Sequence, residues 1–333
     1  MGTLFIDRKD VHIKLDGGAI AFYANGKREG MVPIAPLKRV IVVGNVTIET
    51  SVLNRLTDEG ISVLFLSGRK TKYHGRIEGR LHNNALLRVK QYKKSLISHS
   101  NLFPIYFSCE IVERKIEGQI NFLKEALHER QDLRFTITRG ITVIEKIKGH
   151  VKDLKRELPF QNDAIYDDVN MILMGYEGGA ASSYFSAYTM LFPDSLNFKN
   201  RNRRPPLDPV NSVLSLCYTL LHYEFVREIE MIGLDPFIGF YHQFDYGRES
   251  LACDLVELYR TDVDRFVWRI FRERNFSERD FTYNENRAGC YMKKSARERF
   301  YFLHEEWSRD IRPDLREEVR MLANRINGGE SDG

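Results

Sequence analysis

The sequence has little that would place it in a membrane or in an oxidising compartment. No stretch of its 333 residues approaches 18 uninterrupted apolar residues, and the amino terminus carries Asp7 and Arg8 where a signal peptide needs an apolar run. The four cysteines are widely spaced and form no Cys-x-x-Cys pair, which argues against a structural zinc site and favours reduced core thiols. We expect a cytoplasmic protein with no membrane association.

The first 80 residues have the pattern of a β domain. Short runs of β-branched and aromatic residues alternate there with Gly, Asn and Pro, which is typical of strands separated by turns. One helix interrupts them, because Thr50 can cap a segment in which Val52 and Leu56 repeat at helical spacing. We expect a small, mostly antiparallel β domain at residues 1–80.

From about residue 80 the apolar spacing becomes that of helices. The predicted helical runs lie near residues 84–97, 106–128, 140–156, 163–191, 209–232, 248–258 and 261–274. The sequence therefore predicts an α+β protein, in which an all-helical domain at 81–326, including a linker helix, follows the β domain. The polar tail at 327–333 has nothing to bury, and we expect it to be disordered.

Positive charge is concentrated near the amino terminus. Residues 1–100 carry 17 Lys and Arg against 8 Asp and Glu, a net +9, whereas residues 101–333 carry −5. The excess is densest from Arg69 to Lys94, where nine basic residues are opposed only by Glu78. Such a run is either a solvated face or a phosphate-binding surface. Arg76 and Arg80 are our candidates for contacts with a nucleic acid backbone.

Two acidic residues lie three apart in an apolar segment near residue 255. Asp254 and Glu257 project from one face of the expected helix, and the residues around them are apolar almost all round. Two carboxylates in such surroundings repel each other unless a cation lies between them. A divalent metal ion would meet this need, and pairing with Arg248 or Arg260 is the alternative.

Glu177 lies in a helical segment that contains two consecutive glycines. Each glycine inside a helix costs about 1 kcal/mol relative to Ala, so Gly178 and Gly179 require a reason beyond helix propensity. Close approach of a substrate or of another helix would supply one. The alternative is tight helix packing with Glu177 directed to water.

His242 ends a loop that contains Pro236 and Gly239 and lies 12 residues before Asp254. A lone histidine beside aromatic residues is commonly part of the core. Together with carboxylates, however, an imidazole can hold Mg²⁺ or Mn²⁺ and leave positions open for phosphate oxygens.

A basic loop precedes the helix expected at 209–232. Lys199, Arg201, Arg203 and Arg204 are followed by two prolines, and Asp208 is placed to cap the helix that begins at the next proline. A rigid basic loop that enters a helix amino terminus suits phosphate. A charged linker has a similar composition and stays the alternative.

Taken jointly and in order, four segments resemble the CRISPR-associated integrase family, the metal-dependent endonucleases that insert new spacers into CRISPR arrays. These segments are residues 175–185 (Gly-Tyr-Glu-Gly-Gly-Ala-Ala-Ser-Ser-Tyr-Phe), 203–218 (Arg-Arg-Pro-Pro-Leu-Asp-Pro-Val-Asn onward), 233–242 (Gly-Leu-Asp-Pro-Phe-Ile-Gly-Phe-Tyr-His) and 250–257 (Ser-Leu-Ala-Cys-Asp-Leu-Val-Glu). The resemblance is close from residue 170 to about 300 and includes Gly-Cys-Tyr-Met-Lys-Lys-Ser at 289–295. Towards the amino terminus it rests mainly on β character and on Tyr-His-Gly-Arg at 73–76.

This resemblance implies the site residues and their chemistry. The metal ligands of the family fall on Glu177, His242 and Glu257, and Asp254 is a nearby acid that supports or shares the site. Arg203 and Arg204 fall near the DNA backbone. The implied cofactor is Mg²⁺ or Mn²⁺, and the implied reaction is transesterification, in which a 3′-hydroxyl of a short duplex attacks a phosphodiester at the edge of a repeat.

The resemblance also implies the partners. They are double-stranded DNA, a second copy of the chain in an asymmetric homodimer, and the small ferredoxin-like CRISPR adaptation protein that bridges two such dimers. Two other functions stay open at this point. One is a structure-selective nuclease that uses the same metal site on branched DNA with water as nucleophile. The other is a non-catalytic DNA-binding scaffold, in which the acids only balance the basic loop.

Overall fold

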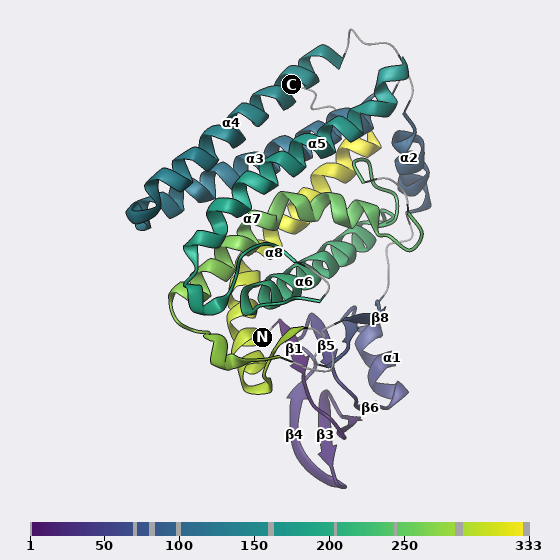
Figure 1. Cartoon of the computed structure of the whole chain (residues 1–333). Helices are drawn as coiled ribbons and strands as arrows, with labels where there is room; N and C mark the ends of the chain where they lie inside the picture. Colours follow the sequence, from purple (N-terminus) through teal and green to yellow (C-terminus); the bar gives the residue numbers. More distant parts are fainter. Residues whose placement is uncertain are drawn as a thin grey trace.

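A β-rich amino-terminal part and a mainly helical remainder make up the chain, as expected (Figure 1). The computed structural model describes residues 2–68, 72–79, 84–97, 101–158, 163–202, 205–242, 245–283 and 289–328, without the side chains of 163–167. The segment predicted to be a disordered tail falls largely outside these residues, since the last helix reaches Asn327 and the description ends at Gly328.

Two four-stranded sheets form the amino-terminal part. One has the order β1-β5-β7-β8 and the other the order β4-β3-β2-β6. The strand bounds are β1 Thr3–Ile6, β2 His12–Asp16, β3 Ala19–Ala24, β4 Lys27–Pro33, β5 Arg39–Val43, β6 Thr47–Ile48, β7 Ser62–Leu66 and β8 Tyr73–Ile77. The interrupting helix α1 spans Thr50–Asp58, with Glu49 rather than Thr50 at its N-cap position and no side-chain cap there.

The sheets are not mostly antiparallel, and that prediction is wrong. Within these two sheets, β1 with β5, β5 with β7 and β2 with β6 are parallel, and the other three pairings are antiparallel. Helix α1 lies between β6 and β7 and returns the chain, so that β7 can run alongside β5 in the same direction. Apolar spacing identifies a strand but does not give the direction of its neighbour.

The sheet that contains β5 is covered on both faces. Val40 and Val42 point into the core of the β domain, whereas Ile41 and Val43 point into the helical core. Every residue of β5 is therefore buried, which is typical of a parallel strand between two layers. This continuity fixes the helical part directly onto the β domain.

The helical part contains the predicted helices. Its helices are α2 Ala85–Ser95, α3 Phe103–Glu129, α4 Arg134–Glu157, α5 Asp163–Tyr188, α6 Pro209–Ile232, α7 Ser250–Arg272 and α8 Lys294–Asn327. Of these, α3, α4 and α7 are longer than the sequence indicated. The two runs predicted at 248–258 and 261–274 are one helix, α7. The domain is not all helical either, because β9 (Phe281–Tyr283) and β10 (Cys290–Met292) form a small antiparallel pair.

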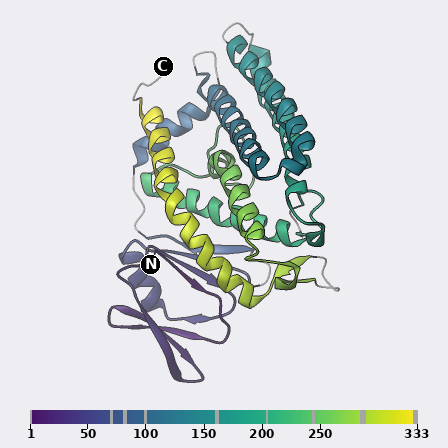
Figure 2. The same cartoon turned by 90° about the vertical axis from the view of Figure 1, so that its left-hand side faces the viewer.

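Helix α8 was absent from the predicted runs, although it is the longest helix described. It extends from the sheets along the helical layer (Figure 2). Its buried residues recur at helical spacing, for example Phe300, His304 and Ser308. Many charged residues and the internal Pro313 interrupt the apolar pattern and conceal this periodicity in the sequence.

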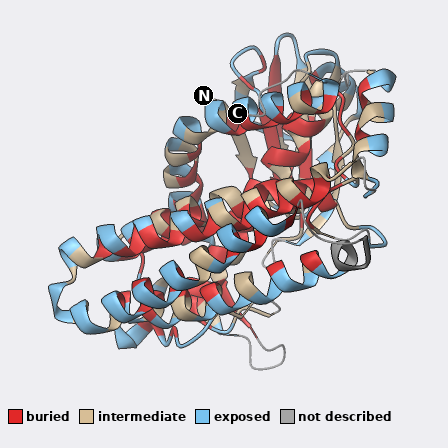
Figure 3. Ribbon diagram, turned by 90° about the horizontal axis from the view of Figure 1, so that it is seen from above, coloured by how far each residue is buried: buried red, intermediate tan, exposed pale blue. Residues whose placement is uncertain are grey.

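The long helices turn buried faces toward one another and exposed faces outward (Figure 3). Helix α3 is central, because it packs against α4, α5 and α7. None of the helices in the part of the chain that the structure describes is both long enough and apolar enough to cross a membrane.

Candidate active site

Helices α5 and α7 each direct one glutamate toward the same cation, the ammonium of Lys115 on α3. Lys115 Nζ forms an ion pair with Glu177 Oε1, and it lies 2.5 Å from Glu257 Oε2. The side chains of Lys115 and Glu257 are 8% and 4% exposed, and that of Glu177 is 21% exposed. Because α3 contacts both α5 and α7, residues more than 60 positions apart meet at one point.

Arg260 gives Glu257 a second positive partner. Its Nε donates to Glu257 Oε2 at 2.7 Å from one helical turn further along α7. Burial by itself would raise the pKa of the Glu257 carboxyl, but the charges of Arg260 and Lys115 hold that pKa well below its usual range. Glu257 is therefore ionised at neutral pH. The pairing with Arg260 that the sequence offered as an alternative to metal binding is present.

Asp254 holds the loop that carries His242. Its carboxylate is fully buried and accepts the backbone N–H groups of Phe240 at 2.7 Å, Tyr241 at 3.1 Å and His242 at 2.9 Å. One of its oxygens also lies 2.8 Å from Nδ1 of His242. A carboxylate can only accept, so Nδ1 is the protonated nitrogen and Nε2 keeps its lone pair for another ligand. Asp254 thus positions the imidazole through Nδ1, the nitrogen other than the proposed ligand atom.

Gly239 and Tyr241 complete this loop. A Cβ at Gly239 would come within 2.7 Å of Asp254 Oδ2 and 2.8 Å of the Ser250 carbonyl carbon, so only glycine lets the loop approach α7 this closely. Tyr241 is buried and donates its hydroxyl to Glu177 Oε2 at 2.6 Å. The loop therefore fixes His242 through Asp254 and Glu177 through Tyr241.

The two glycines beside Glu177 leave open surface. A Cβ at Gly178 would meet nothing within 4 Å, and one at Gly179 would make an ordinary contact of 3.4 Å with Ile147 of α4. Gly178 is exposed. Tight helix packing therefore does not explain Gly178, and its open face is available to a substrate.

The donor set fits a cation between Glu177 and Glu257. Two carboxylates and an imidazole are ligands that Mg²⁺ and Mn²⁺ accept, and the two carboxylates already converge on one positive charge. Within the described residues, no three His, Cys, Asp or Glu side chains stand close enough together to hold a metal ion. The ammonium of Lys115 has the position between the two carboxylates, and a metal ion would have to replace it there.

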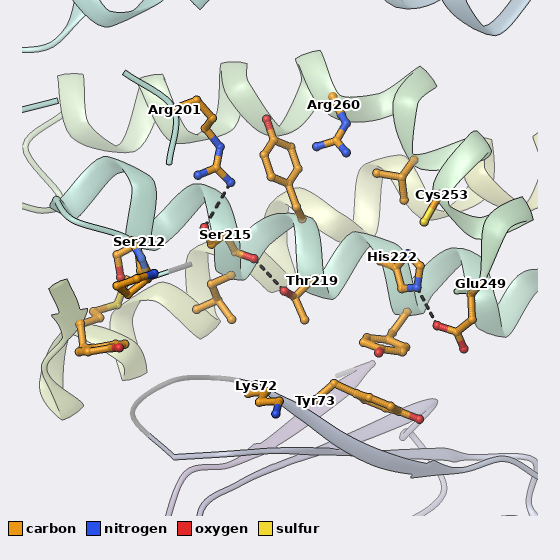
Figure 4. Close-up of a pocket in the computed structure, with 18 of the residues that line it drawn as sticks. Lys72, Tyr73, Arg201, Ser212, Ser215, Thr219, His222, Glu249, Cys253 and Arg260 are labelled. Atoms are coloured by element: carbon orange, nitrogen blue, oxygen red, sulfur yellow. Dashed lines mark hydrogen bonds and ion pairs between the residues drawn. The ribbon is translucent and has the colours of Figure 1, made fainter. Parts of the chain in front are cut away.

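A basic pocket of about 940 Å³ adjoins these residues (Figure 4). It lies between the start of β8, with Lys72 and Tyr73, and helices α6 and α7. Arg260 belongs both to this pocket and to the ion pair with Glu257. Five Lys and Arg side chains line the pocket against one carboxylate, that of Glu249. The positive charge and the size suit a phosphate-bearing strand.

His222 lies on one wall of the pocket beside Glu249 and Cys253 (Figure 4). Its Nε2 is 2.8 Å from Glu249 Oε2. Burial alone would lower the pKa of His222, but hydrogen bonds to Cys253 and Glu249 raise it to about 9. Burial would raise the pKa of the Cys253 thiol, and the protonated imidazole lowers it. Cys253 is thus not the inert core thiol that the sequence predicted, unlike the three buried cysteines.

Of the four arginines predicted to contact DNA, only Arg76 lies within the described residues. Arg76 lies on β8 with its side chain 15% exposed, and its guanidinium contacts Glu230 at 2.6 Å and Glu249 at 2.5 Å. It therefore ties the β domain to α6 and to the residue before α7. Arg80, Arg203 and Arg204 lie outside the described residues. The neighbours of the last two, Arg201 and Pro205, line the pocket, and Asp208 caps α6 as expected.

Sequence reasoning missed Lys115 and Tyr241. A signal for Lys115 was present, because it falls between Val112 and Gln119 on the buried stripe of α3, where an unpaired lysine would be costly. For Tyr241 there was no comparable signal, since an aromatic residue in a loop is commonly part of the core. Only the fold reveals that its hydroxyl reaches Glu177.

Comparison with known proteins gives one consistent result. The family described as "CRISPR associated protein Cas1" matches residues 4–306. The chain is 51% identical over 326 residues to CRISPR-associated endonuclease Cas1 1 of Thermodesulfovibrio yellowstonii, which covers 98% of this chain and 97% of the relative. A CAS1 protein from Thermotoga maritima has the same fold, with a TM-score of 0.79 and 23% identity over 100% of this chain and 99% of its own. A chain of a Cas6-RT-Cas1–Cas2 complex has a TM-score of 0.78 and 22% identity, over 99% of this chain and 35% of that one.

Proposed function

Because the chain belongs to the Cas1 family, and is thus a CRISPR-associated endonuclease and integrase of spacer acquisition, we propose that Glu177, His242 and Glu257 are the residues at which it joins DNA. The reaction is attack of a 3′-hydroxyl of a short duplex on a phosphodiester at the edge of a repeat. One phosphodiester forms and one breaks, and the departing 3′-oxygen takes up the proton. No protein nucleophile is required.

The observation that carries this proposal is the convergence of Glu177 and Glu257 on one cation. The two carboxylates come from different helices, each of which packs on α3. Their meeting point would suit Mg²⁺ or Mn²⁺, which Glu177 and Glu257 would hold together with His242. The chemistry that such a cation supplies is Lewis-acid polarisation of phosphate oxygens and of the attacking hydroxyl.

The surrounding residues have supporting roles. Asp254 is a positioning residue, because its carboxylate accepts hydrogen bonds from the backbone of the His242 loop and from Nδ1 of the His242 ring. Tyr241 fixes the rotamer of Glu177. Arg260 compensates Glu257 and presents positive charge to the pocket, where a phosphate would lie.

The basic pocket supports a path for DNA next to the site. Arg201, Arg248 and Arg297 line it together with Lys72 and Arg260. Arg203 and Arg204 lie outside the described residues and stay predicted contacts with the DNA backbone. The support for them is that Arg201 and Pro205 on either side line this pocket. Arg76 on β8 and Arg80, which lies outside the described residues, also stay predicted DNA contacts.

We further propose that the chain works as a homodimer with the small ferredoxin-like CRISPR adaptation protein. The fold-level likeness to a chain solved in a Cas6-RT-Cas1–Cas2 complex is the support for this partner. The joining reaction requires two 3′ ends to reach two target sites, and a bridged pair of dimers would supply that geometry.

The test separates joining from hydrolysis. A supercoiled plasmid with a repeat array is incubated with Mg²⁺, the adaptation protein and a short duplex that ends in 3′-hydroxyl or in dideoxynucleotides. We expect the intact duplex to be joined covalently and the dideoxy duplex not to be joined. Glu177→Gln and His242→Ala should each lower the yield at least ~100-fold, whereas Glu145→Gln, in an exposed ion pair on α4, should not.

Two results would count against the proposal. Cutting of plasmid or branched DNA without any joined product, with the adaptation protein bound, would favour the structure-selective nuclease. Full joining by Glu177→Gln or His242→Ala would remove these residues from the site.

A further inference from the structure

We propose that Lys115 is a tethered competitor of the metal ion, whose ammonium holds the place between Glu177 and Glu257 until a divalent cation displaces it. The inference rests on the proposed function, because it concerns the same two carboxylates. It assigns a role to a residue that comes from α3, outside the motifs that identified the site.

The position of Lys115 requires an explanation. A lysine whose side chain is 8% exposed carries a large desolvation cost unless anions compensate it. Lys115 lies on the buried stripe of α3 next to Val112 and Ile116, and its compensation comes from the two glutamates. The three side chains therefore form one unit, in which the ammonium does what a bound cation would do.

The charges at the site balance without a metal ion. Glu177 and Glu257 contribute two negative charges, and Lys115 and Arg260 contribute two positive ones. A divalent ion added to this set would leave an excess of two positive charges in a mostly buried place. Departure of the ammonium relieves half of this excess.

The geometry leads to the same conclusion. Glu177 has one oxygen on Lys115 and the other on the hydroxyl of Tyr241. Glu257 Oε2 accepts from both Lys115 and Arg260. A metal ion held at the point where the two carboxylates converge would occupy the place of the ammonium, so the ammonium and the metal ion would be alternatives there. Lysine has a flexible stem of four carbons, and its head can leave while its helix stays fixed.

A purely structural ion pair makes a different prediction. If Lys115 only stabilises the fold, its removal lowers stability equally with and without metal and does not improve metal binding. If it competes, its removal lowers stability only without metal and tightens metal binding. Metal affinity therefore distinguishes the two roles, independently of any reaction.

The full-length protein is stripped of metal with a chelator and titrated with Mn²⁺ alone. Calorimetry and the paramagnetic signal of free Mn²⁺ measure the binding. The variants are Lys115→Met, Lys115→Gln and Lys115→Arg. Lys124→Met, in an exposed ion pair on the same helix, is the matched control. Because the competing charge is lost, Lys115→Met and Lys115→Gln should each bind Mn²⁺ about tenfold or more tighter than the wild type does. Lys115→Arg and Lys124→Met should stay near the wild-type value.

Thermal unfolding gives the second readout. Without metal, Lys115→Met should melt below the wild type, and Mn²⁺ should raise its melting temperature by more than it raises that of the wild type. Binding of Mn²⁺ no tighter than in the wild type would overturn the proposal. So would failure of both neutral variants to fold in saturating Mn²⁺, because the displaced lysine must be dispensable in the metal-bound state.

Glu177→Gln and His242→Ala keep the two proposals distinguishable. If these variants bind Mn²⁺ as the wild type does, the metal site itself is elsewhere and the proposed function fails. If they lose Mn²⁺ while Lys115→Met gains no affinity, the metal site stands and only the role of Lys115 fails.

Discussion

The carboxylate of Asp254 and the imidazole of His242 meet at 2.8 Å, between Oδ1 and Nδ1, at the amino-terminal part of α7. The same carboxylate accepts three consecutive backbone N–H groups of the loop, so ring and backbone are fixed by one buried anion. Such a carboxylate behind a histidine sets its tautomer and its direction. The sequence could not say which of Asp254 and Glu257 would bind a metal ion directly, and our proposal of Glu257 for that role is supported by this relationship, because it occupies the Asp254 carboxylate with the loop.

Asp254→Asn should therefore lower both stability and joining. An amide offers one acceptor oxygen where the carboxylate offers two, and its NH₂ group would face backbone donors. We expect a loss of about 2–4 kcal/mol in the free energy of unfolding, measured by denaturant titration. Joining should fall with it, because His242 loses its orientation.

Asp262→Asn is the matched control on the same helix. Its carboxylate is 38% exposed and pairs with Arg265 three residues away. Its replacement should change the unfolding free energy by less than about 1 kcal/mol. If the two substitutions lower the free energy of unfolding equally, the hydrogen bonds of Asp254 to the loop do not stabilise the protein more than an exposed ion pair does.

Gly239→Ala tests the close approach of the loop to α7. Its Cβ would come within 3 Å of Asp254 Oδ2 and of backbone atoms of Ser250 and Leu251, none of which can swing away. We expect a loss of about 1–3 kcal/mol in stability and a displaced His242, read as weaker Mn²⁺ binding. Unchanged Mn²⁺ affinity would contradict this.

Gly178→Ala should raise the stability of the protein, in contrast to Gly239→Ala. A methyl group there meets nothing within 4 Å, and Ala is the better helix former by about 1 kcal/mol. The melting temperature should rise. If DNA runs along this open face beside Glu177, joining should fall despite the gain in stability, and full joining activity would exclude that path.

The sequence predicts a site residue when its local context is unusual, but it does not predict partners that are brought together by the packing of helices. Glu177, His242 and the acids Asp254 and Glu257 could be singled out because each lies in an unusual local context, and the resemblance to the family then indicated which of them are ligands. Lys115 could not be paired with them, because its partners depend on how α3 packs against α5 and α7. The break predicted within α7 arose because polar residues near Thr261 interrupt the apolar run, and tertiary burial of Thr261 and Asp264 overrides that interruption.

The direction of the strands illustrates the same limit. The four apolar residues of β5, Val40 to Val43, predict a strand, and their burial on two faces becomes clear only when both cores are present. A charged residue such as Arg39, which begins this strand, is tolerated because Glu224 of α6 lies 2.6 Å away. Long-range pairings of this kind leave no trace in local spacing.

His222 should make stability depend on alkaline pH. Its pKa is raised from 6.5 to about 9 by Cys253 and Glu249 against the effect of burial, so the protonated form is favoured in the folded state. The stabilisation is complete below pH 6.5 and is lost as pH rises through 9, for a total of up to about 3 kcal/mol. Urea unfolding of the wild type and of His222→Gln at pH 6.5 and 9.5 measures the difference.

The wild type should lose more stability across this interval than His222→Gln does. His12→Gln is the control, because His12 is 40% exposed and pairs only loosely with Glu49 at 3.4 Å. That variant should follow the wild type. Parallel curves for the wild type and His222→Gln would mean that the imidazole is not held protonated by its neighbours.

The basic residues should separate into DNA contacts and structural ties when salt is varied. Each phosphate contact contributes about 0.9 to the slope of log affinity against log salt, so Arg203→Gln with Arg204→Gln should flatten that slope by roughly 2. The melting temperature should hardly change. Arg76→Met should behave differently, because its guanidinium pairs with Glu230 and Glu249 in a part-buried place.

Loss of Arg76 leaves two acids without their partner and should cost about 3 kcal/mol of stability in addition to any loss of DNA affinity. Duplex binding by fluorescence anisotropy from 50 to 300 mM salt, on unrelated sequences, measures the slopes, and thermal unfolding measures the stabilities. The loop pair should change the slope alone, since its neighbours Arg201 and Pro205 already line the basic pocket. A slope that both sets of substitutions leave unchanged would mean that none of these arginines contacts a phosphate and that the DNA path runs elsewhere.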